Sequence, residues 1–523
     1  MRFYGGGISL LLILILSASV SGQYVRKSRF ANEQARRVQY ELDDWVSYLQ
    51  SRHISHIAES PDYLYFATRD GGVLRYNLYD RYWDYPYTTS NGLPENYVRE
   101  IYYDRENAFL YAVTRRDEAV FNPASEEWII RSQQLSWPYQ KPVNRDSSDF
   151  GRFFDERQLD KLPLFLANRP YVLMGDWRLQ DENFEEFPVT GFLKDRNSKV
   201  WMAVEGFGVA IGDMFTQRAD FIQLGLPNIR PRAIAYQQKD LWVAGLPANR
   251  GTSRGGIGFW PFSDPSWQYY QDRWISEMPS DRVVDIATAG QRVWFASDMG
   301  LTRFDTKTGE WRHFGLSEGL LDNQVLDLEV TGDYLYIATE NGLNRLLLEG
   351  NTLEKVRDSR FVSLRFNSIA AQGDTLWAGT PRGIFRRPGL KAEWDFVVPE
   401  TATRDDQVRA IAVKDSVVWF ATGGGAIEYH LKSERWEGFP QLALEITPPY
   451  RDIAVTSGGV FIATGEGLLK FDRQGRFWKL FTESDGLLDN RCYKLLPDGQ
   501  FLWIVTDSGL TQFRWYSEMR ADY

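Results

Sequence analysis

The stretch SEGLLDNQVLDLEVTGDYLYIATENGL, from Ser317 to Leu343, decides the fold because a near copy of it occurs close to the C-terminus. The second copy is SDGLLDNRCYKLLPDGQFLWIVTDSGL, from Ser484 to Leu510. Each copy has 27 residues, and the two begin 167 residues apart. Each joins a polar connector to two short apolar runs and a Gly-containing turn. A repeated unit of this kind indicates a repeat architecture.

The two copies are members of a longer series. Every unit contains a short apolar run whose second residue is aromatic, followed by a turn and another short run. These aromatic positions are Tyr65, Tyr111, Trp201, Trp242, Trp294, Tyr336, Trp377, Trp419, Phe461 and Trp503. The last four steps are 41 or 42 residues, so the offset of 167 is about four periods. The step from Tyr111 to Trp201 is 90 residues, about two periods.

Each unit carries four strand signals, shown by the unit that starts at Arg282. RVVDIATA (Arg282 to Ala289) is followed by VWFAS, GLTRFD and the aromatic run EWRHFG (Glu310 to Gly315). β-Branched and aromatic residues favour strands, and Gly in the middle turn permits positive φ. Four short strands in about 42 residues are typical of a β-propeller blade. We therefore predict an all-β propeller of about ten four-stranded blades.

The two chain ends are expected to meet in one blade. The last unit lacks an outer strand, and DDWVSYLQ (Asp43 to Gln50) resembles outer strands such as RFWKLF (Arg476 to Phe481). We predict that Trp45 to Leu49 completes the last blade, which removes exposed sheet edges. The alternative is an N-terminal helix beginning near Asn32. One ring of ten or eleven blades would be large, so two smaller rings, one inserted in the other, are the alternative architecture.

The chain divides into an export signal, a linker and the repeats. Residues 1–22 contain an apolar run and then small residues, which is typical of a signal peptide, and the run is too short to span a membrane comfortably. Residues 23–42 are expected to be a linker or short helix, and 43–523 the propeller. Residues 131–189 are irregular, and form either a decoration or a degenerate eleventh blade. We expect an exported protein, periplasmic or extracellular, without a stable transmembrane anchor.

Composition and motifs argue against several kinds of chemistry. The net charge is −10 and no basic patch indicates nucleic-acid binding. Cys492 is the only cysteine and is expected to be a buried small hydrophobe. His53 and His56 would point to opposite faces of a strand, which disfavours a metal site. No catalytic, metal or cofactor motif occurs, although abundant carboxylates leave a glycosidase pair open.

A ligand is expected on the face that carries the turns between second and third strands. The candidate ligand-binding residues there are Arg69, Asp70, Asp298, Glu340, Asn341, Glu466 and Asp507, with Arg250 and Arg254 in the long turn Pro247 to Gly256. Arginines there would suit acidic sugars or a carboxylate-bearing partner, and the alternative is a solvated loop. The recurrent Trp residues are expected to pack blade on blade. The inner-strand acids face the channel mouth or bond to the neighbouring blade's backbone; these are Glu100, Asp285, Asp327 and Asp452.

The repeats resemble the two-component regulator propeller repeat. The matching pieces are NGLPENYVREI (Asn91 to Ile101), EGLLDNQVLDL (Glu318 to Leu328), DGLLDNRCYKL (Asp485 to Leu495) and LWAGTPRGIFR from Leu376. The resemblance covers most of the chain after about residue 50, with 131–189 as the departure. It implies an exported propeller like those that form the glycan-detecting part of hybrid histidine kinases, or that act alone in surface and secretion systems. Since this sequence contains no kinase, we expect the protein either to act as a free exported protein or to hand its signal to a partner such as a separate sensor kinase.

Three functions remain open on the sequence. The leading hypothesis is an exported, non-enzymatic propeller that binds a glycan or an envelope protein, in sensing or signalling. The rival is a propeller enzyme that degrades polysaccharide. The third is a structural scaffold of a surface or secretion complex.

Overall fold

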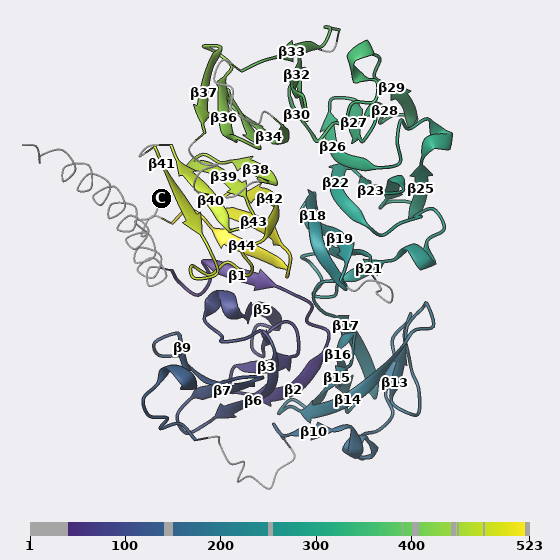
Figure 1. The fold of residues 1–523 in the computed structure, drawn as a ribbon. Helices are drawn as coiled ribbons and strands as arrows, with labels where there is room; N and C mark the ends of the chain where they lie inside the picture. Colours follow the sequence, from purple (N-terminus) through teal and green to yellow (C-terminus); the bar gives the residue numbers. More distant parts are fainter. Residues whose placement is uncertain are drawn as a thin grey trace, which may run out of the picture.

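The computed structural model is nearly all β, as predicted, and its strands form ten separate sheets (Figure 1). It describes residues 40–140, 150–248, 255–389, 391–399, 407–440, 446, 449–473 and 476–517. The expected export signal at 1–22 lies outside the described residues, as does the expected linker apart from its last residues. Within the described part, no helix is long and apolar enough to cross a membrane.

Seven of the sheets form a closed ring. Their inner strands β18, β22, β26, β30, β34, β38 and β42 contact one another in chain order, and β42 contacts β18. The first sheet consists of β18 (Ile229–Gln237), β19 (Asp240–Pro247), β20 (Ile257–Trp260) and β21 (Gln268–Tyr270), and the second of β22 (Val283–Ala289), β23 (Arg292–Ser297), β24 (Gly300–Asp305) and β25 (Glu310–Phe314). The third sheet consists of β26 (Val325–Thr331), β27 (Tyr334–Thr339), β28 (Gly342–Leu347) and β29 (Thr352–Lys355), and the fourth of β30 (Ser368–Gln372), β31 (Thr375–Thr380), β32 (Gly383–Arg387) and β33 (Asp395–Val397). The fifth sheet consists of β34 (Val408–Lys414), β35 (Val417–Thr422), β36 (Gly425–His430) and β37 (Arg435–Phe439). The sixth consists of β38 (Asp452–Val455), β39 (Gly459–Ala463), β40 (Leu468–Asp472) and β41 (Phe477–Phe481). The seventh consists of β42 (Cys492–Asp498), β43 (Phe501–Thr506), β44 (Leu510–Arg514) and β1 (Trp45–Tyr48).

The predicted pairing of the two chain ends is confirmed. β1 lies antiparallel to β44, with Trp45 opposite Phe513, and it supplies the outer strand of the last sheet. The Trp45 ring stacks on the Phe513 ring at 3.8 Å between centroids. The Ser47 hydroxyl is within hydrogen-bond distance of Thr511 Oγ1 at 2.9 Å. This contact covers the edge of β44 that would otherwise be open.

The remaining three sheets form an arc that is inserted in the chain between β1 and β18. The first is β2 (Ile54–Glu59), β3 (Tyr63–Thr68), β4 (Val73–Asn77) and β5 (Tyr82–Tyr87), and the second is β6 (Val98–Asp104), β7 (Phe109–Thr114), β8 (Glu118–Asn122) and β9 (Glu127–Ile130). β2 contacts β6 on one side and both β14 and β15 on the other, so the first sheet lies between the other two (Figure 1). The chain order therefore matches the alternative in which one ring is inserted in another, but the inserted unit is an arc of three sheets and not a second closed ring.

The third sheet of the arc has eight strands because the irregular segment adds to it. Its blade is β14 (Glu186–Lys194), β15 (Lys199–Val204), β16 (Gly208–Asp213) and β17 (Arg218–Gln223). The segment 131–189 supplies four further strands, which are β10 (Phe153–Asp155), β11 (Leu166–Ala167), β12 (Val172–Leu173) and β13 (Arg178–Gln180). β13 and β12 extend the sheet beyond β14, β10 also pairs with β14, and β11 pairs with β17. The structure therefore merges this segment into an existing sheet.

Among the described residues, six short 3-10 helices lie in the connections. They are η1 (Thr89–Asn91), η2 (Arg131–Gln133), η3 (Glu156–Lys161), η4 (Asp272–Trp274), η5 (Leu316–Glu318) and η6 (Ser359–Phe361).

A hydroxyl and a glycine fix the middle turn of most blades. A Ser or Thr at the end of the second strand, or directly after it, donates its hydroxyl to the carbonyl of the turn glycine. Examples are Thr339 to Gly342 at 2.8 Å and Thr464 to Gly467 at 2.7 Å. The glycines adopt φ of +137° and +145°, where a Cβ would be strained. This geometry explains why the turns share a Thr-x-x-Gly pattern.

The recurrent tryptophans are buried between blades, as predicted. Trp242, Trp294, Trp377 and Trp419 are all 0% exposed. Trp242 lies 5.5 Å from Phe295 and Trp377 lies 5.6 Å from Phe420, in each case a ring of the next blade. Such aromatic contacts add about 0.5–1.5 kcal/mol beyond the area that they bury. Cys492 is 0% exposed in the same kind of core, which confirms the structural interpretation of the only cysteine.

Candidate functional site in the pocket between arc and ring

The turn residues proposed as ligand contacts are engaged in pairs within the ring. The turn carboxylates bind arginines of the connectors and inner strands. These pairs are Arg282 Nε to Asp298 Oδ2 at 2.7 Å, Arg365 Nη1 to Glu340 Oε2 at 2.8 Å and Arg232 Nη2 to Asp507 Oδ1 at 2.6 Å. Asn341 donates to Asp322, and the Glu466 N–H donates to Thr464 Oγ1 at 3.1 Å. Arg250 and Arg254 lie outside the described residues.

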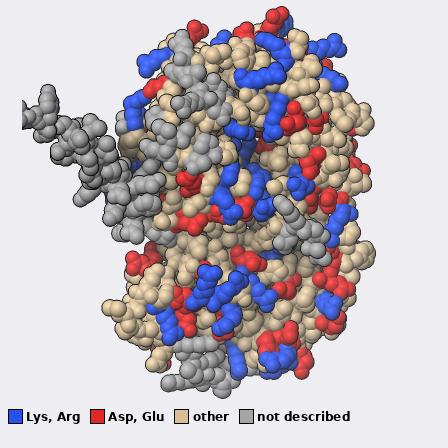
Figure 2. Space-filling view, viewed as in Figure 1, with Lys and Arg blue, Asp and Glu red and all other residues tan. Residues whose placement is uncertain are grey.

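Some of the arginines at the mouth of the ring stack on an aromatic side chain. Lys and Arg side chains gather over the middle of the ring in Figure 2. The guanidinium carbons of Arg232 and Arg451 lie 3.5 and 4.1 Å from the centroid of the Tyr493 ring. Arg451 also donates to the Cys492 carbonyl at 2.9 Å. These arginines hold neighbouring blades together.

The inner-strand acids bond to the next blade, which confirms one of the two predicted roles. Their carboxylates accept backbone N–H groups: Leu328 to Asp285 at 2.9 Å, Ile369 to Asp327 at 2.7 Å and Leu495 to Asp452 at 2.7 Å. Glu100 differs, because it accepts the Tyr102 hydroxyl at 2.5 Å and pairs with Arg99.

Lys494 crosses the centre of the ring. Its Nζ lies 2.9 Å from Asp285 Oδ1 and 3.6 Å from Asp327 Oδ1, which belong to blades that are not neighbours of its own. Burial raises the pKa of Asp327, while Lys494 opposes that rise. Burial likewise raises the pKa of Glu329, to about 7. These charged groups pair with one another and with backbone groups, so we assign them a role in stabilising the centre of the ring.

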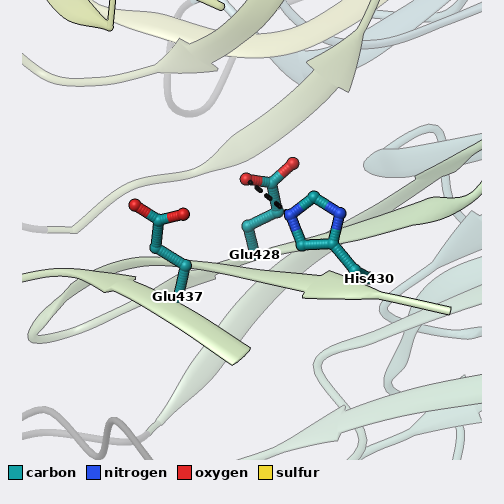
Figure 3. A group of neighbouring side chains, drawn as sticks. All are labelled: Glu428, His430 and Glu437. Carbon is teal, nitrogen blue, oxygen red and sulfur yellow. Dashed lines mark ion pairs between the residues drawn. The ribbon is translucent and has the colours of Figure 1, made fainter. Parts of the chain in front are cut away.

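Glu428, His430 and Glu437 form a further cluster, drawn in Figure 3. Glu428 and Glu437 face each other across β36 and β37, where like charges repel. Arginines compensate them: Arg473 lies 3.8 Å from Glu428, and both Arg435 and Arg476 pair with Glu437. With these cations in place the carboxylates act in ion pairs between two blades, and the cluster is a poor cation site.

The pocket that stands out lies where the arc meets the ring. Its volume is about 710 Å³. It is lined from the arc side by the connector before β2, the turn between β13 and β14, and the ends of β15 and β17. From the ring side it is lined by β21, η4 and the residues before β21. Pockets of this size at the junction of two domains are typical ligand sites.

Hydrogen bonds of backbone and side-chain groups fix the two walls relative to each other. The Trp267 N–H donates to the Gln223 carbonyl at 2.9 Å, and the Gln223 N–H donates to Ser266 Oγ at 3.0 Å. The Tyr269 hydroxyl donates to the Gly225 carbonyl at 2.7 Å. Arg273 of η4 pairs with Glu185 of the arc. The pocket is therefore preformed.

The acidic wall is a tight turn. Asp181 Oδ1 accepts the N–H of Asn183 at 2.9 Å and of Glu185 at 2.8 Å, and Phe184 has φ of +61°. This side-chain bond reverses the chain between β13 and β14, as Asp commonly does in turns. It presents Glu182 and Asn183 at the pocket.

Two of the predicted residues, Arg69 and Asp70, contact residues that line the pocket. Arg69 Nη1 is 3.1 Å from Glu205 Oε1, and His53 Nδ1 is 3.0 Å from the same oxygen. Asp70 lies 3.9 Å from His53 Nε2. Hydrogen bonding from His53 lowers the pKa of Glu205. Among the described residues, the buried atoms Arg52 Nε and Glu205 Oε2 have no hydrogen-bond partner, so polar capacity remains at the pocket.

The sequence did not lead us to predict that the aromatic residues of the pocket lie together. Tyr171, Tyr269, Tyr270 and Trp274 line it, and Trp274 is 47% exposed. They come from segments far apart in the chain, so no local motif unites them. The signal that could have found them is the clustering of aromatic and acidic residues in DENFEEF (181–187) and WQYYQDRW (267–274).

Comparison with known proteins supports the fold. No family model and no curated protein matches the chain. PorZ, a surface component of the type-IX secretion system of Porphyromonas gingivalis, has 13% identity and a TM-score of 0.55, with 90% of this chain and 87% of PorZ covered. The extracellular domains of two hybrid two-component systems of B. thetaiotaomicron are each 14% identical to this chain, with TM-scores of 0.45 and 0.46. Each alignment covers 89% of this chain, and the two cover 70% and 83% of the other chain. The similarity to PorZ supports the β-propeller fold.

Proposed function

We propose that this protein is an exported, non-catalytic β-propeller that binds a glycan in the pocket between arc and ring. The observation that carries the proposal is the combination of aromatic rings with planar polar side chains in one preformed cavity. Tyr270 and Trp274 offer flat faces for sugar rings, and Asn183, Asn228 and Gln271 offer hydrogen-bond groups for hydroxyls. Arg69 and Asp70 support the rim through Glu205 and His53.

A glycan array followed by calorimetry tests this function. We expect the purified protein to bind one class of oligosaccharide without changing it, and Trp274→Ala to weaken binding about fivefold, since stacking on an exposed ring contributes about 1 kcal/mol. Phe477→Ala, at an exposed aromatic residue of the ring (44% exposed), is the control and should bind normally. Release of reducing ends or unsaturated sugars would replace the proposal by a polysaccharide-degrading enzyme.

A second function has one specific observation in its favour. The fold similarity to PorZ extends over 90% of this chain, and PorZ is a component of a secretion system. A role as a scaffold in a surface complex predicts stoichiometric envelope partners in a pull-down and no binding on the glycan array. A pull-down that instead yields a sensor kinase would place the protein in signalling.

A further inference from the structure

The pocket between arc and ring has an excess of acidic groups. Of its carboxylates, Glu185 is paired with Arg273, Glu186 with Arg178, and Glu205 with His53 and Arg69. Glu182 and Asp264 also line the pocket, and no ion pair involves either of them among the described residues. Among the described residues that line the pocket, Arg52 is the only Lys or Arg. The uncompensated charge is therefore negative.

These carboxylates act on the tyrosines of the pocket. Burial, together with the charges of Glu182, Asp181 and Asp264, raises the pKa of Tyr171 to about 12. Burial also raises the pKa of Tyr270 to about 12, again with Glu182 contributing. The negative potential thus reaches rings from both the arc and the ring.

Two aromatic rings of the pocket already hold a cation. The guanidinium carbon of Arg52 lies 5.2 Å from the centroid of Tyr269, and that of Arg273 lies 4.9 Å from Trp274. Cations favour the faces of such rings. The pocket therefore combines the two features that stabilise a positive charge, which are aromatic faces and carboxylates that are not in an ion pair, although Asp264 Oδ1 accepts the Ser266 N–H at 2.8 Å.

We propose that the ligand of this pocket carries positive charge, and that it is a glycan with free amino groups whose ammonium is held by Glu182 and Asp264 beside Tyr171. This rests on the proposed function and narrows its ligand class. It replaces the acidic sugar suggested by the arginines of the turns, because the acidic groups here would repel a carboxylate. The ammonium supplies the donors that these carboxylates accept.

Three oligosaccharides of equal length test the inference by calorimetry on the full chain: glucosamine, N-acetylglucosamine and galacturonic acid oligomers. We expect the glucosamine oligomer to bind at least about tenfold more tightly than the acetylated one, because charge-assisted hydrogen bonds are about twice as strong as neutral ones. Its affinity should fall as salt screens the partly exposed carboxylates. Equal or tighter binding of the acetylated or acidic oligomer would overturn the inference and leave the proposed glycan function standing.

Variants separate charge from shape. Glu182→Gln with Asp264→Asn should abolish the preference for the glucosamine oligomer and leave binding of the acetylated one unchanged. Glu127→Gln, at an exposed glutamate of β9 outside the pocket lining, is the matched control and should keep the preference. A preference that survives the double substitution would contradict the inference.

An oligolysine peptide distinguishes this inference from the proposed function. If the peptide binds and no oligosaccharide does, the glycan proposal fails while the cation preference holds. If neither binds, both are overturned.

Discussion

Trp45 and Trp274 both lie where separate parts of the chain meet, but they differ in burial. Trp45 is 1% exposed and packs on Phe513 and Phe481, whereas Trp274 is 47% exposed and lines the pocket. A buried Trp contributes to stability through the area and contacts that it removes from water. An exposed one contributes little to folding and is available to a ligand.

We predict that Trp45→Ala destabilises the protein by about 3–5 kcal/mol, the usual cost of truncating a buried Trp to Ala. The loss follows from the cavity against Phe513 and from weaker pairing of β1 with β44. Urea unfolding followed by Trp fluorescence would measure it. Trp274→Ala is the control and should unfold within about 0.5 kcal/mol of the wild type, as exposed substitutions usually do. Equal losses in the two variants would contradict the closure as a source of stability.

At the scale of single elements, the inner strands of the ring carry ionisable groups that report on packing. Glu329 of β26 accepts the Ala371 N–H of the next blade at 2.9 Å. Burial raises its pKa to about 7. Its native form therefore binds a proton at a pH where the unfolded chain has lost it. The stability that Glu329 contributes is full at low pH and declines as pH rises through about 7.

Glu329→Gln should remove this part of the pH dependence. The amide oxygen can keep the bond to Ala371, and the side chain remains neutral at every pH. We expect the variant to match the wild type at about pH 5 and to be more stable at about pH 8, where the wild-type carboxylate is ionised. Urea midpoints at the two pH values measure the difference. The control Glu127→Gln should leave the change of stability with pH as in the wild type. If the difference in stability between the wild type and Glu329→Gln is the same at both pH values, the pKa of Glu329 is not raised.

The individual blades were predictable because each element is specified locally. The aromatic second-strand residue, the Thr-x-x-Gly turn and the polar connector recur with the period, so strand content and blade boundaries follow from residues such as Trp419 and Gly425. The pairing of Trp45 with the last blade was predictable from a missing strand. The grouping into seven and three sheets was not, because the contact of β2 with β14 joins segments without a shared pattern. The pocket was hidden for the same reason.

At the scale of the whole molecule, Lys494 links blades across the ring. Its ammonium faces Asp285 and Asp327, and because the Lys494 side chain is 28% exposed, its loss should cost less than about 3–5 kcal/mol, the usual cost for a fully buried ion pair. We predict that Lys494→Met destabilises the protein, and more at about pH 8 than at about pH 5, because protonation relieves the remaining carboxylates at low pH. Thermal unfolding at both pH values tests this. Lys494→Arg keeps the charge and should recover most of the stability; a Met variant with unchanged stability would contradict the role of the pair.

The seating of the arc on the ring should depend on Arg273. This residue joins η4 of the ring to Glu185 of the arc and stacks on Trp274. Arg273→Glu places a like charge opposite Glu185, so we expect the walls of the pocket to separate locally while both groups of sheets stay folded. Hydrogen exchange should then be faster in 181–187 and 267–274 and unchanged in β44. Arg178→Glu, which breaks an ion pair within the arc, is the matched control and should leave 267–274 as in the wild type. If exchange at 267–274 is the same in both variants, the ion pair does not hold the arc against the ring, and the hydrogen bonds of Trp267, Ser266 and Tyr269 hold the junction without it.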